Sequence, residues 1–181
     1  MTTLKLGKLP ARISDKSVLS DYSAATGFDP NDPSTDQGTD MQAAASYRKK
    51  TGIRDAKGKR HKIDGYLAIR SPYELKQAVW LFGAAGLGVE FPKSAMKQFD
   101  AGKPFTVEKS GITAGHYMPV IGYDKNWVYL VTWGKVVQAK YGWVNKYMDE
   151  SIAYFSLGML KNGKSLEGFD LITLQKDIAA I

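Results

Sequence analysis

His116 is the residue of this chain best suited to acid–base chemistry, and it is one of only two histidines, the other being His61. An imidazole titrates near neutral pH and can take a proton from a nucleophile. The chain has no cysteine, which excludes a thiol nucleophile, a disulfide and a thiolate metal site. Two histidines are also too few for a multi-histidine site, so we predict no metal and no cofactor. Any nucleophile that works with His116 must therefore be something other than a thiol.

A predicted β-hairpin holds His116 at the start of its first strand. Side chains alternate over residues 117–123, and a polar turn follows. Residues 127–133 are rich in β-branched and aromatic side chains, which favours a second strand that ends at Trp133 and Gly134. The hairpin would fix the position of the imidazole relative to a sheet.

Two of the predicted helices that precede this hairpin have clear start signals. Thr39 and Gln42 have the spacing of a capping box, with Thr39 as N-cap, at the start of a helix over residues 37–50 that Gly52 ends. The second helix begins after Ser71, where a Ser-Pro-x-Glu sequence supplies an N-cap and a proline at the first helical position. An apolar face at helical spacing follows and ends at a pair of glycines.

The remaining elements complete an α+β chain with helices first and strands later. Residues 1–36 read as an extended N-terminal arm with a turn of helix near 17–22, and residues 37–181 read as a single domain. The other predicted strands are 59–69, 87–91 and 152–156, and the other predicted helices are 94–100, 141–149 and 170–181.

Composition is that of a globular protein, with 181 residues, 44% hydrophobic and 24% charged. No apolar run approaches the roughly 20 residues that a membrane helix needs, so no membrane partner is expected. The first 17 residues lack the apolar core of a signal peptide, and we expect synthesis in a cytoplasm without secretion.

Much of the net charge of +7 lies between residues 48 and 62, where Asp55 is the single acid. Such a cluster can bind phosphates or another polyanion. It can equally be a solvated helix end and turn, and we favour this interpretation because no nucleic-acid motif accompanies the charge. Nucleic acid is therefore not an expected partner. The candidate binding residues are Arg48, Lys49, Lys50, Lys59 and Arg60.

The order of motifs from residue 71 to residue 149 resembles the papain-like cysteine peptidases. Gly115-His116 through Gly122-Tyr123-Asp124 is similar to the "GHAV…VGYD" strand that carries the histidine of that family, and Trp133-Gly134 is similar to its "NSWG" strand. Residues 74–78, 85–91 and 99–104 look like its "LK-A" helix, "GPVSVAI" strand and "F–Y–GIY" turn. The resemblance covers roughly half of the chain. It implies a papain-like fold, with an N-terminal helical part packed on a C-terminal antiparallel β-rich half.

The family site can be compared with this chain residue by residue. Gln37 fits the glutamine that donates to the oxyanion. The nucleophile position falls on Ala43 by spacing from Gln37, or on Asp40 if the helix starts are aligned, and neither can replace a thiolate. The position of the orienting asparagine falls on Val131, which cannot orient a histidine. The resemblance therefore implies a vestigial site of Gln37, Asp40, Ala43, His116, Val131 and Trp133.

Two segments, residues 36–53 and residues 115–134, also resemble small papain-like proteins of actinobacterial phages. The resemblance implies a virion or assembly protein whose partners are other virion proteins or further copies of itself. We predict a catalytically inactive papain-like protein that acts by protein–protein contact, in which His116 is a hydrogen-bonded strand residue.

Two alternatives stay open. One is a peptidase, or a peptidoglycan amidase or endopeptidase, with His116 as base and a nucleophile that is not cysteine. Its candidate hydroxyls are Thr39, Ser46 and Thr132, and no base except His116 is placed for them. The second alternative is a polyanion-binding module formed by the basic residues named above, whose binding would weaken steeply with salt.

Overall fold

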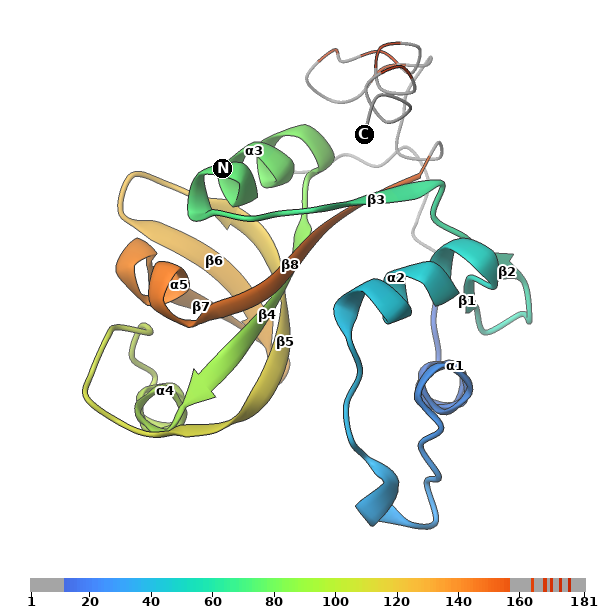
Figure 1. Ribbon diagram of the computed structural model, residues 1–181, viewed down its shortest axis with the longest axis horizontal. Coiled ribbons are helices and arrows are strands. Elements are labelled where there is room, and N and C mark those ends of the chain that lie inside the picture. Colours follow the sequence, from blue (N-terminus) through green and yellow to red (C-terminus); the bar gives the residue numbers. More distant parts are fainter. Residues whose placement is uncertain are drawn as a thin grey trace. The chain divides into compact units, whose positions relative to one another are not determined.

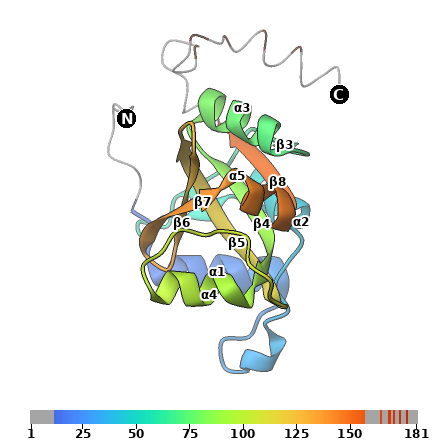
Figure 2. The same ribbon diagram turned by 90° about the vertical axis from the view of Figure 1, so that its left-hand side faces the viewer.

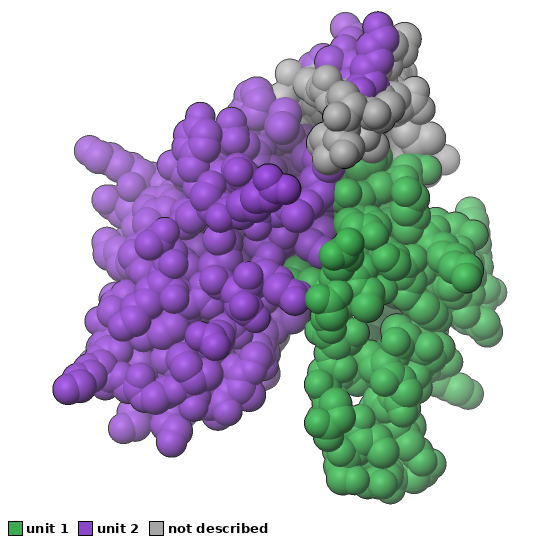
Figure 3. Space-filling model, viewed as in Figure 1, with its two compact units in different colours: residues 1–66, 155–159 green, residues 67–154, 160–181 purple. Residues whose placement is uncertain are grey.

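The computed structural model describes residues 12–156 and the single residues 164, 168, 170, 173 and 176. The chain divides into two compact units, coloured separately in Figure 3. Unit 1 comprises Met1–Tyr66 and Phe155–Met159, and unit 2 comprises Leu67–Tyr154 and Leu160–Ile181. Among the described residues, no helix is long and apolar enough to cross a membrane.

Unit 1 carries the helices of the N-terminal half (Figure 1). Its elements are α1 (Asp15–Thr26), a short 3-10 helix (Pro33–Thr35), α2 (Met41–Lys50), β1 (Ile53–Arg54) and β2 (Arg60–His61). The strands β1 and β2 form an antiparallel pair. Helix α1 begins at Ser14, whose hydroxyl accepts the N–H of Ser17, and it is longer than the turn expected near residues 17–22. The predicted division into an arm and one domain stays a prediction.

Helix α2 begins at Met41 rather than at the predicted residue 37, and its N-cap lies one residue later than the sequence predicts. Its N-cap is Asp40, whose Oδ1 accepts the N–H of Ala43 at 2.7 Å. The prediction of Thr39 as N-cap is therefore wrong, because the carboxylate of Asp40 takes the free N–H and the hydroxyl of Thr39 donates to the Asp40 carbonyl at 3.3 Å. The predicted end is confirmed, since Gly52 has a positive φ of 79° and its N–H reaches the carbonyl of Tyr47 at 3.2 Å.

Asp21 on α1 is the polar centre of unit 1 and is only 4% exposed. Its Oδ1 accepts from the Tyr47 hydroxyl at 3.0 Å and from Nη1 of Arg60 at 2.8 Å, and its Oδ2 accepts the N–H of Arg54 at 2.7 Å. Burial acts to raise the pKa of Asp21, but these three donors outweigh it, and the pKa lies below its ordinary value. Asp21 thereby joins α1 to α2 and to the β1–β2 pair.

Unit 2 contains most of a six-stranded sheet. The elements that follow β2 are β3 (Gly65–Ala68), α3 (Pro72–Phe82), β4 (Ala85–Pro92), α4 (Lys93–Asp100), β5 (Ile112–Tyr123), β6 (Trp127–Thr132), β7 (Lys135–Lys140), α5 (Tyr141–Tyr147) and β8 (Met148–Phe155). The strand order is β3-β8-β4-β5-β6-β7, and β8, β4, β5, β6 and β7 pair antiparallel with their neighbours. Figure 2 shows α3 at one end of the sheet and α4 at the other. The predicted α+β class, with helices first and an antiparallel sheet later, is confirmed.

The core of unit 2 follows from the two-residue period of its strands. Alternate residues of β4, β5 and β6 are fully or almost fully buried on one face, and apolar residues of α3 and α5 pack against them. These residues are Leu87 and Val89 on β4, Met118 and Val120 on β5, Val128 and Leu130 on β6, Leu75 and Val79 on α3, and Trp143 and Val144 on α5.

Several element bounds differ from prediction. The expected strand over residues 59–69 is two short strands that belong to different sheets, since β2 pairs with β1 and β3 lies in the six-stranded sheet. The predicted hairpin is confirmed as β5 and β6, but β7 follows it at once and was not predicted. Strand β8 begins at Met148, four residues before the predicted start and inside the expected helix. The predicted helix over 170–181 lies almost entirely outside the described residues.

Candidate functional site

The imidazole of His116 lies at the edge of the unit 2 core. His116 pairs with Val89 of β4, and on β5 it shares a face with the fully buried Met118. The ring is half-buried, and its Nε2 lies 2.8 Å from the hydroxyl oxygen of Thr132. The edge of the Phe91 ring faces the imidazole, with centroids 5.2 Å apart. The strand period thus places the histidine among apolar side chains with one polar partner.

Thr132, rather than Val131, is the hydrogen-bond partner of His116. Thr132 is the last residue of β6 and continues the buried face of Leu130, with only 5% of its surface exposed. Val131 pairs with Val136 of β7 and points to the opposite face of the strand. The alternation of side chains along β6 is the sequence signal that could have identified Thr132. A residue of β6 whose side chain contacts a core-facing histidine must itself lie on the core face of that strand.

Trp133 covers the His116 imidazole from one side. The two rings are stacked, with centroids 4.6 Å apart and planes 16° apart. The indole also meets Phe99 of α4 and Phe91 of β4 edge-on, at 4.7 Å and 5.5 Å. Trp133 is nevertheless 46% exposed. It therefore forms part of the surface while it shields the imidazole.

The backbone of Trp133 is strained. Its φ is +44°, and among the described residues no other amino acid besides glycine has a positive φ. Gly134 follows with a φ of +73°, and together the two residues connect β6 to β7. Positive φ at both central residues is the geometry of a type I′ turn, which glycine and asparagine adopt more easily than tryptophan. The ring contacts of Trp133 hold it in this conformation.

The surroundings of His116 favour the neutral form of the imidazole. Burial lowers its pKa below the ordinary value, and across residues 12–156 no acid forms an ion pair with it. No described residue forms a hydrogen bond with Nδ1. A hydroxyl can donate as well as accept, so Thr132 can hold either tautomer of the ring. A neutral imidazole can accept a proton. Among the described residues, however, no carboxylate or amide bonds to the ring and fixes which of its nitrogens accepts that proton.

Thr132 itself is poorly placed to attack a substrate. Its hydroxyl is hydrogen-bonded to His116, which is the pairing a nucleophile and its base require. However, the side chain is buried at the end of β6, so that a substrate carbonyl could not reach it without movement of the surrounding residues. Thr132 can therefore orient the imidazole but is not an accessible nucleophile.

The other predicted site residues lie in unit 1, where local bonds occupy two of them. The amide Nε2 of Gln37 donates to the carbonyl of Ser34 at 2.8 Å, within its own loop. The carboxylate of Asp40 caps α2, and the exposed Ala43 is one of the first residues of that helix. Gln37 and Asp40 thus have structural roles within unit 1, which also contains Ala43, whereas His116, Val131 and Trp133 belong to unit 2.

The basic residues of unit 1 do not form one free cationic surface. Arg60 is bound to Asp21 and also donates to the carbonyl of Gly52 at 2.7 Å. Lys49, Lys50 and Lys59 are exposed. Arg48 and Lys49 also lie in the last turn of α2, where cations are favourable to the helix dipole. Arg60 therefore has an internal structural role, and the polyanion hypothesis stays a prediction.

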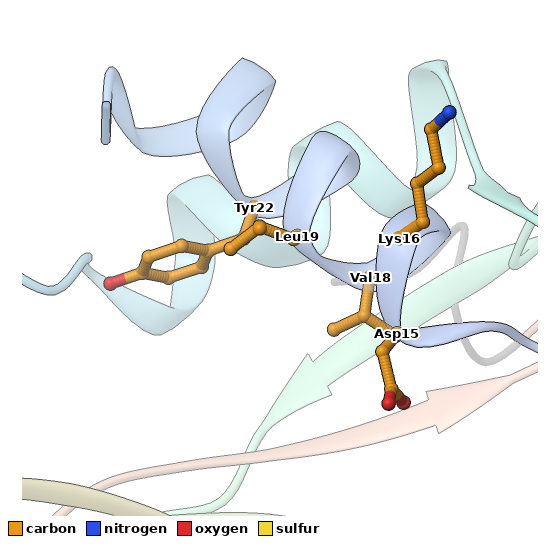
Figure 4. A pocket seen from close by; sticks show the side chains of 5 residues that line it. All are labelled: Asp15, Lys16, Val18, Leu19 and Tyr22. Carbon is orange, nitrogen blue, oxygen red and sulfur yellow. The ribbon is translucent and has the colours of Figure 1, made fainter. Parts of the chain in front are cut away.

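The described residues contain no group of three or more histidine or acidic side chains that could hold a metal ion. A pocket of about 430 Å³ lies on α1 and is lined by Asp15, Lys16, Val18, Leu19 and Tyr22 (Figure 4). The side chains of Asp15 and Lys16 point in different directions (Figure 4). None of the predicted site residues lines this pocket, which has no paired acid and base.

Solved structures with the same arrangement of elements are papain-like. The crystal structure of a cysteine protease from Carica candamarcensis matches with a TM-score of 0.54 and 13% identity, over 82% of this chain and 93% of the protease chain. A structure from work on antibody cross-reactivity between the mite allergens Blo t 1 and Der p 1 matches with a TM-score of 0.50 and 13% identity. That match covers 81% of this chain and 57% of the allergen chain.

The sequence itself has no such match, since no family model matches it and no curated protein is significantly similar to it. At 13% identity, the structural likeness establishes the fold alone. The chain has a papain-like α+β fold, which confirms the fold that the motif order implied. The loss of activity and the resemblance to phage proteins stay predictions.

Proposed function

We propose that this protein is a catalytically inactive papain-like protein that acts by protein–protein contact, as a structural or accessory component of a phage particle. The observation that carries the proposal is the absence of any cysteine from a chain with this fold. A peptidase of the papain type depends on a thiolate that an imidazole activates. Without a thiolate, the folded protein can still bind a partner through its surface, and the core that maintains this surface would be retained.

The local roles of the other site positions support the same proposal. Asp40 is used as a helix cap, and Gln37 is bonded within its own loop. His116 has a buried hydroxyl as its partner in place of the family's asparagine amide. Each residue has a structural function that requires no catalysis. The virion role is supported by the resemblance of residues 36–53 and 115–134 to phage proteins.

Hydrolysis assays test the inactive assignment. We would incubate wild-type protein, His116→Ala and His61→Ala with a peptide library and with peptidoglycan, after checking by circular dichroism that all three are folded. His61→Ala is a matched control, because it removes the other histidine of the chain. We expect no turnover by any of the three. Turnover by wild type and His61→Ala that disappears in His116→Ala would overturn the proposal.

A second candidate function is a hydrolase with His116 as base and a nucleophile other than cysteine. The observations in its favour are the burial that lowers the pKa of His116 and the Nδ1 atom, which has no hydrogen-bond partner among the described residues. The activity of such a hydrolase would decrease as the pH drops below the pKa of His116, because the protonated ring cannot act as a base. Alanine substitutions at Thr39, Ser46 and Thr132 would then identify the nucleophile.

Sedimentation analysis tests the contact role. A protein that assembles through its own copies would show a concentration-dependent mass, and one that assembles with other virion proteins would remain monomeric alone and form a stable complex with a capsid or tail protein. A monomer that binds none of the virion proteins of its phage would contradict the assembly role.

A further inference from the structure

Strand β7 is an edge strand of the six-stranded sheet, and half of its main-chain groups face away from β6. Thr132 and Lys135 flank the turn and are paired in register. Residues that flank a two-residue turn exchange both of their main-chain hydrogen bonds, and the following pairs alternate. Val136, Gln138 and Lys140 therefore direct their N–H and C=O groups outward, to the free side of the strand.

Phe105 already forms main-chain hydrogen bonds with the outer side of β7, as a residue of a neighbouring strand would. The N–H of Phe105 donates to the Gln138 carbonyl at 2.7 Å, and the Lys140 N–H donates to the Phe105 carbonyl at 2.9 Å. This bridge confirms the outward direction of both groups. Two residues earlier, the N–H of Lys103 donates to the carbonyl of Gln98 at 2.8 Å and not to β7.

Three main-chain groups consequently remain open, namely the N–H and C=O of Val136 and the N–H of Gln138. We call them the β7 edge. No described residue forms a hydrogen bond with them. Val136 is 61% exposed, so an apolar contact is available beside the open backbone. Open strand edges pair readily with extended segments of other chains.

We propose that the β7 edge binds an extended, acidic peptide segment of a partner protein by β-strand addition. The main-chain groups supply the hydrogen bonds, and Val136 contacts an apolar side chain of the peptide. The exposed lysines on β7 and on the segment before Phe105 are Lys103, Lys135 and Lys140, and the exposed acids near them are Asp100 and Asp124, the second of which interacts with Lys140. This excess of positive charge favours carboxylates in the partner.

The same charges disfavour a second copy of this chain as the occupant. Two β7 strands paired edge to edge would bring their lysines close together, and lysines on edge strands are a known device against such self-pairing. Like charges opposed across a strand pair are destabilising. The occupant we infer is therefore a different, acidic chain.

The proposal deepens the contact role and rests on it only in taking the partner to be a protein. Its failure is distinguishable from the failure of the inactive assignment, because one is measured by peptide binding and the other by hydrolysis. Peptide binding at the β7 edge would persist in His116→Ala, since none of the three open groups belongs to His116 or its hydrogen-bond partner.

Nuclear magnetic resonance of the full-length, ¹⁵N-labelled protein tests the proposal directly. The probe is a capped peptide of alternating glutamate and valine, added to millimolar concentration. We expect the amide signals of Val136 and Gln138 to shift and their hydrogen exchange to slow several-fold. A peptide of alternating lysine and valine should bind at least tenfold more weakly, and an acidic peptide with N-methylated backbone should not slow exchange.

Charge reversals test the electrostatic part. Lys103→Glu and Lys135→Glu should each weaken binding of the acidic peptide about three- to tenfold. Lys125→Glu is the matched control, because it makes the same charge change in the turn at the opposite end of β6, and its affinity should stay within about twofold of wild type. The peptide experiments use the wild-type protein, so the proposal stays testable if a variant fails to fold.

Three results would overturn the proposal. The first is the absence of any shift at Val136 and Gln138 up to several millimolar peptide. The second is equal binding of the acidic and basic peptides. The third is a concentration-dependent dimer of the free protein in which these two amides are protected, which would make a second copy the occupant.

Discussion

Trp133 shows how one side chain can hold a strained backbone. Its positive φ disfavours any side chain with a Cβ, yet the indole contacts His116, Phe91 and Phe99. Ring contacts of this kind contribute roughly 0.5–1.5 kcal/mol each beyond area burial, comparable with the cost of about 1–2 kcal/mol for a left-handed residue. The residue keeps the turn closed and the imidazole shielded.

Substitution of Trp133 separates these two contributions. Trp133→Ala removes the ring contacts and keeps the strain, so we expect a loss of about 1–3 kcal/mol in the free energy of unfolding. Trp133→Asn loses the same contacts but creates the Asn-Gly pair that type I′ turns prefer, and it should be about 1 kcal/mol more stable than Trp133→Ala. Urea denaturation measures both. Equal stability of the two variants would show that the turn is not strained.

His116 makes a contribution that depends on pH. Its folded-state pKa is lowered by burial from the ordinary 6.5, so the unfolded chain binds the proton more tightly. The free energy of unfolding should therefore fall as pH drops below about 6.5, until the folded pKa is passed. His116→Gln should lack this part of the pH dependence. A folded-state pKa above 6.5 in an NMR titration would contradict the burial argument.

At the scale of elements, the start of α2 shows how two adjacent residues, Thr39 and Asp40, compete for the N-cap position. The carboxylate of Asp40 accepts the Ala43 N–H, while the Thr39 side chain makes only a long bond to the next carbonyl. Both residues favour the N-cap position, so the sequence alone does not distinguish them. The path by which the preceding loop enters the helix decides which of the two residues becomes the N-cap.

Alanine substitutions at these two residues test the cap. Asp40→Ala should lower the free energy of unfolding by about 1 kcal/mol, the usual value for a lost N-cap. Thr39→Ala is the matched control and should change it by no more than about 0.5 kcal/mol. Chemical denaturation under identical conditions compares the two. A larger loss for Thr39→Ala than for Asp40→Ala would restore the sequence-based assignment.

At the scale of the molecule, different kinds of contact stabilise the interior of each unit. Unit 2 has an apolar core in which β4, β5 and β6 contribute alternate residues. Among the described residues of unit 1, few apolar side chains are buried, and Asp21 joins segments that are distant in sequence. A buried carboxylate with three donors is costly to disturb, because each donor is left without its partner.

Asp21→Asn should therefore weaken unit 1. We expect a loss of about 1–3 kcal/mol, below the range for a fully buried ion pair because the Arg60 side chain is 30% exposed. Asp15→Asn, on the same helix but exposed, should cost only a few tenths of a kcal/mol. Amide hydrogen exchange of α1, α2, β1 and β2 measures the effect. Unchanged exchange in Asp21→Asn would show that other contacts hold unit 1.

The pH dependence of Asp21 follows from the same contacts. Its folded pKa is below the ordinary 3.8, so its stabilising contribution is present above that pH and is lost as pH falls through the folded value. Asp21→Asn should lack this loss at acid pH.

Local sequence by itself determined much of this protein. The hairpin of β5 and β6, the helix after Ser71 and the α+β class were readable because each has a periodic pattern or a cap that depends on neighbouring residues. The absence of cysteine, which excludes thiol catalysis, needs no structure.

Tertiary structure decided the rest, because it depends on contacts between segments that no local pattern reports. Thr132 is the partner of His116 only because β5 and β6 pair in one register, and a shift by one residue would bring Val131 to that face. Arg60 is part of an internal ion pair because α1 packs against β1, the strand that pairs with β2. The open edge of β7 likewise arises from the pairing of two strands and the short bridge at Phe105.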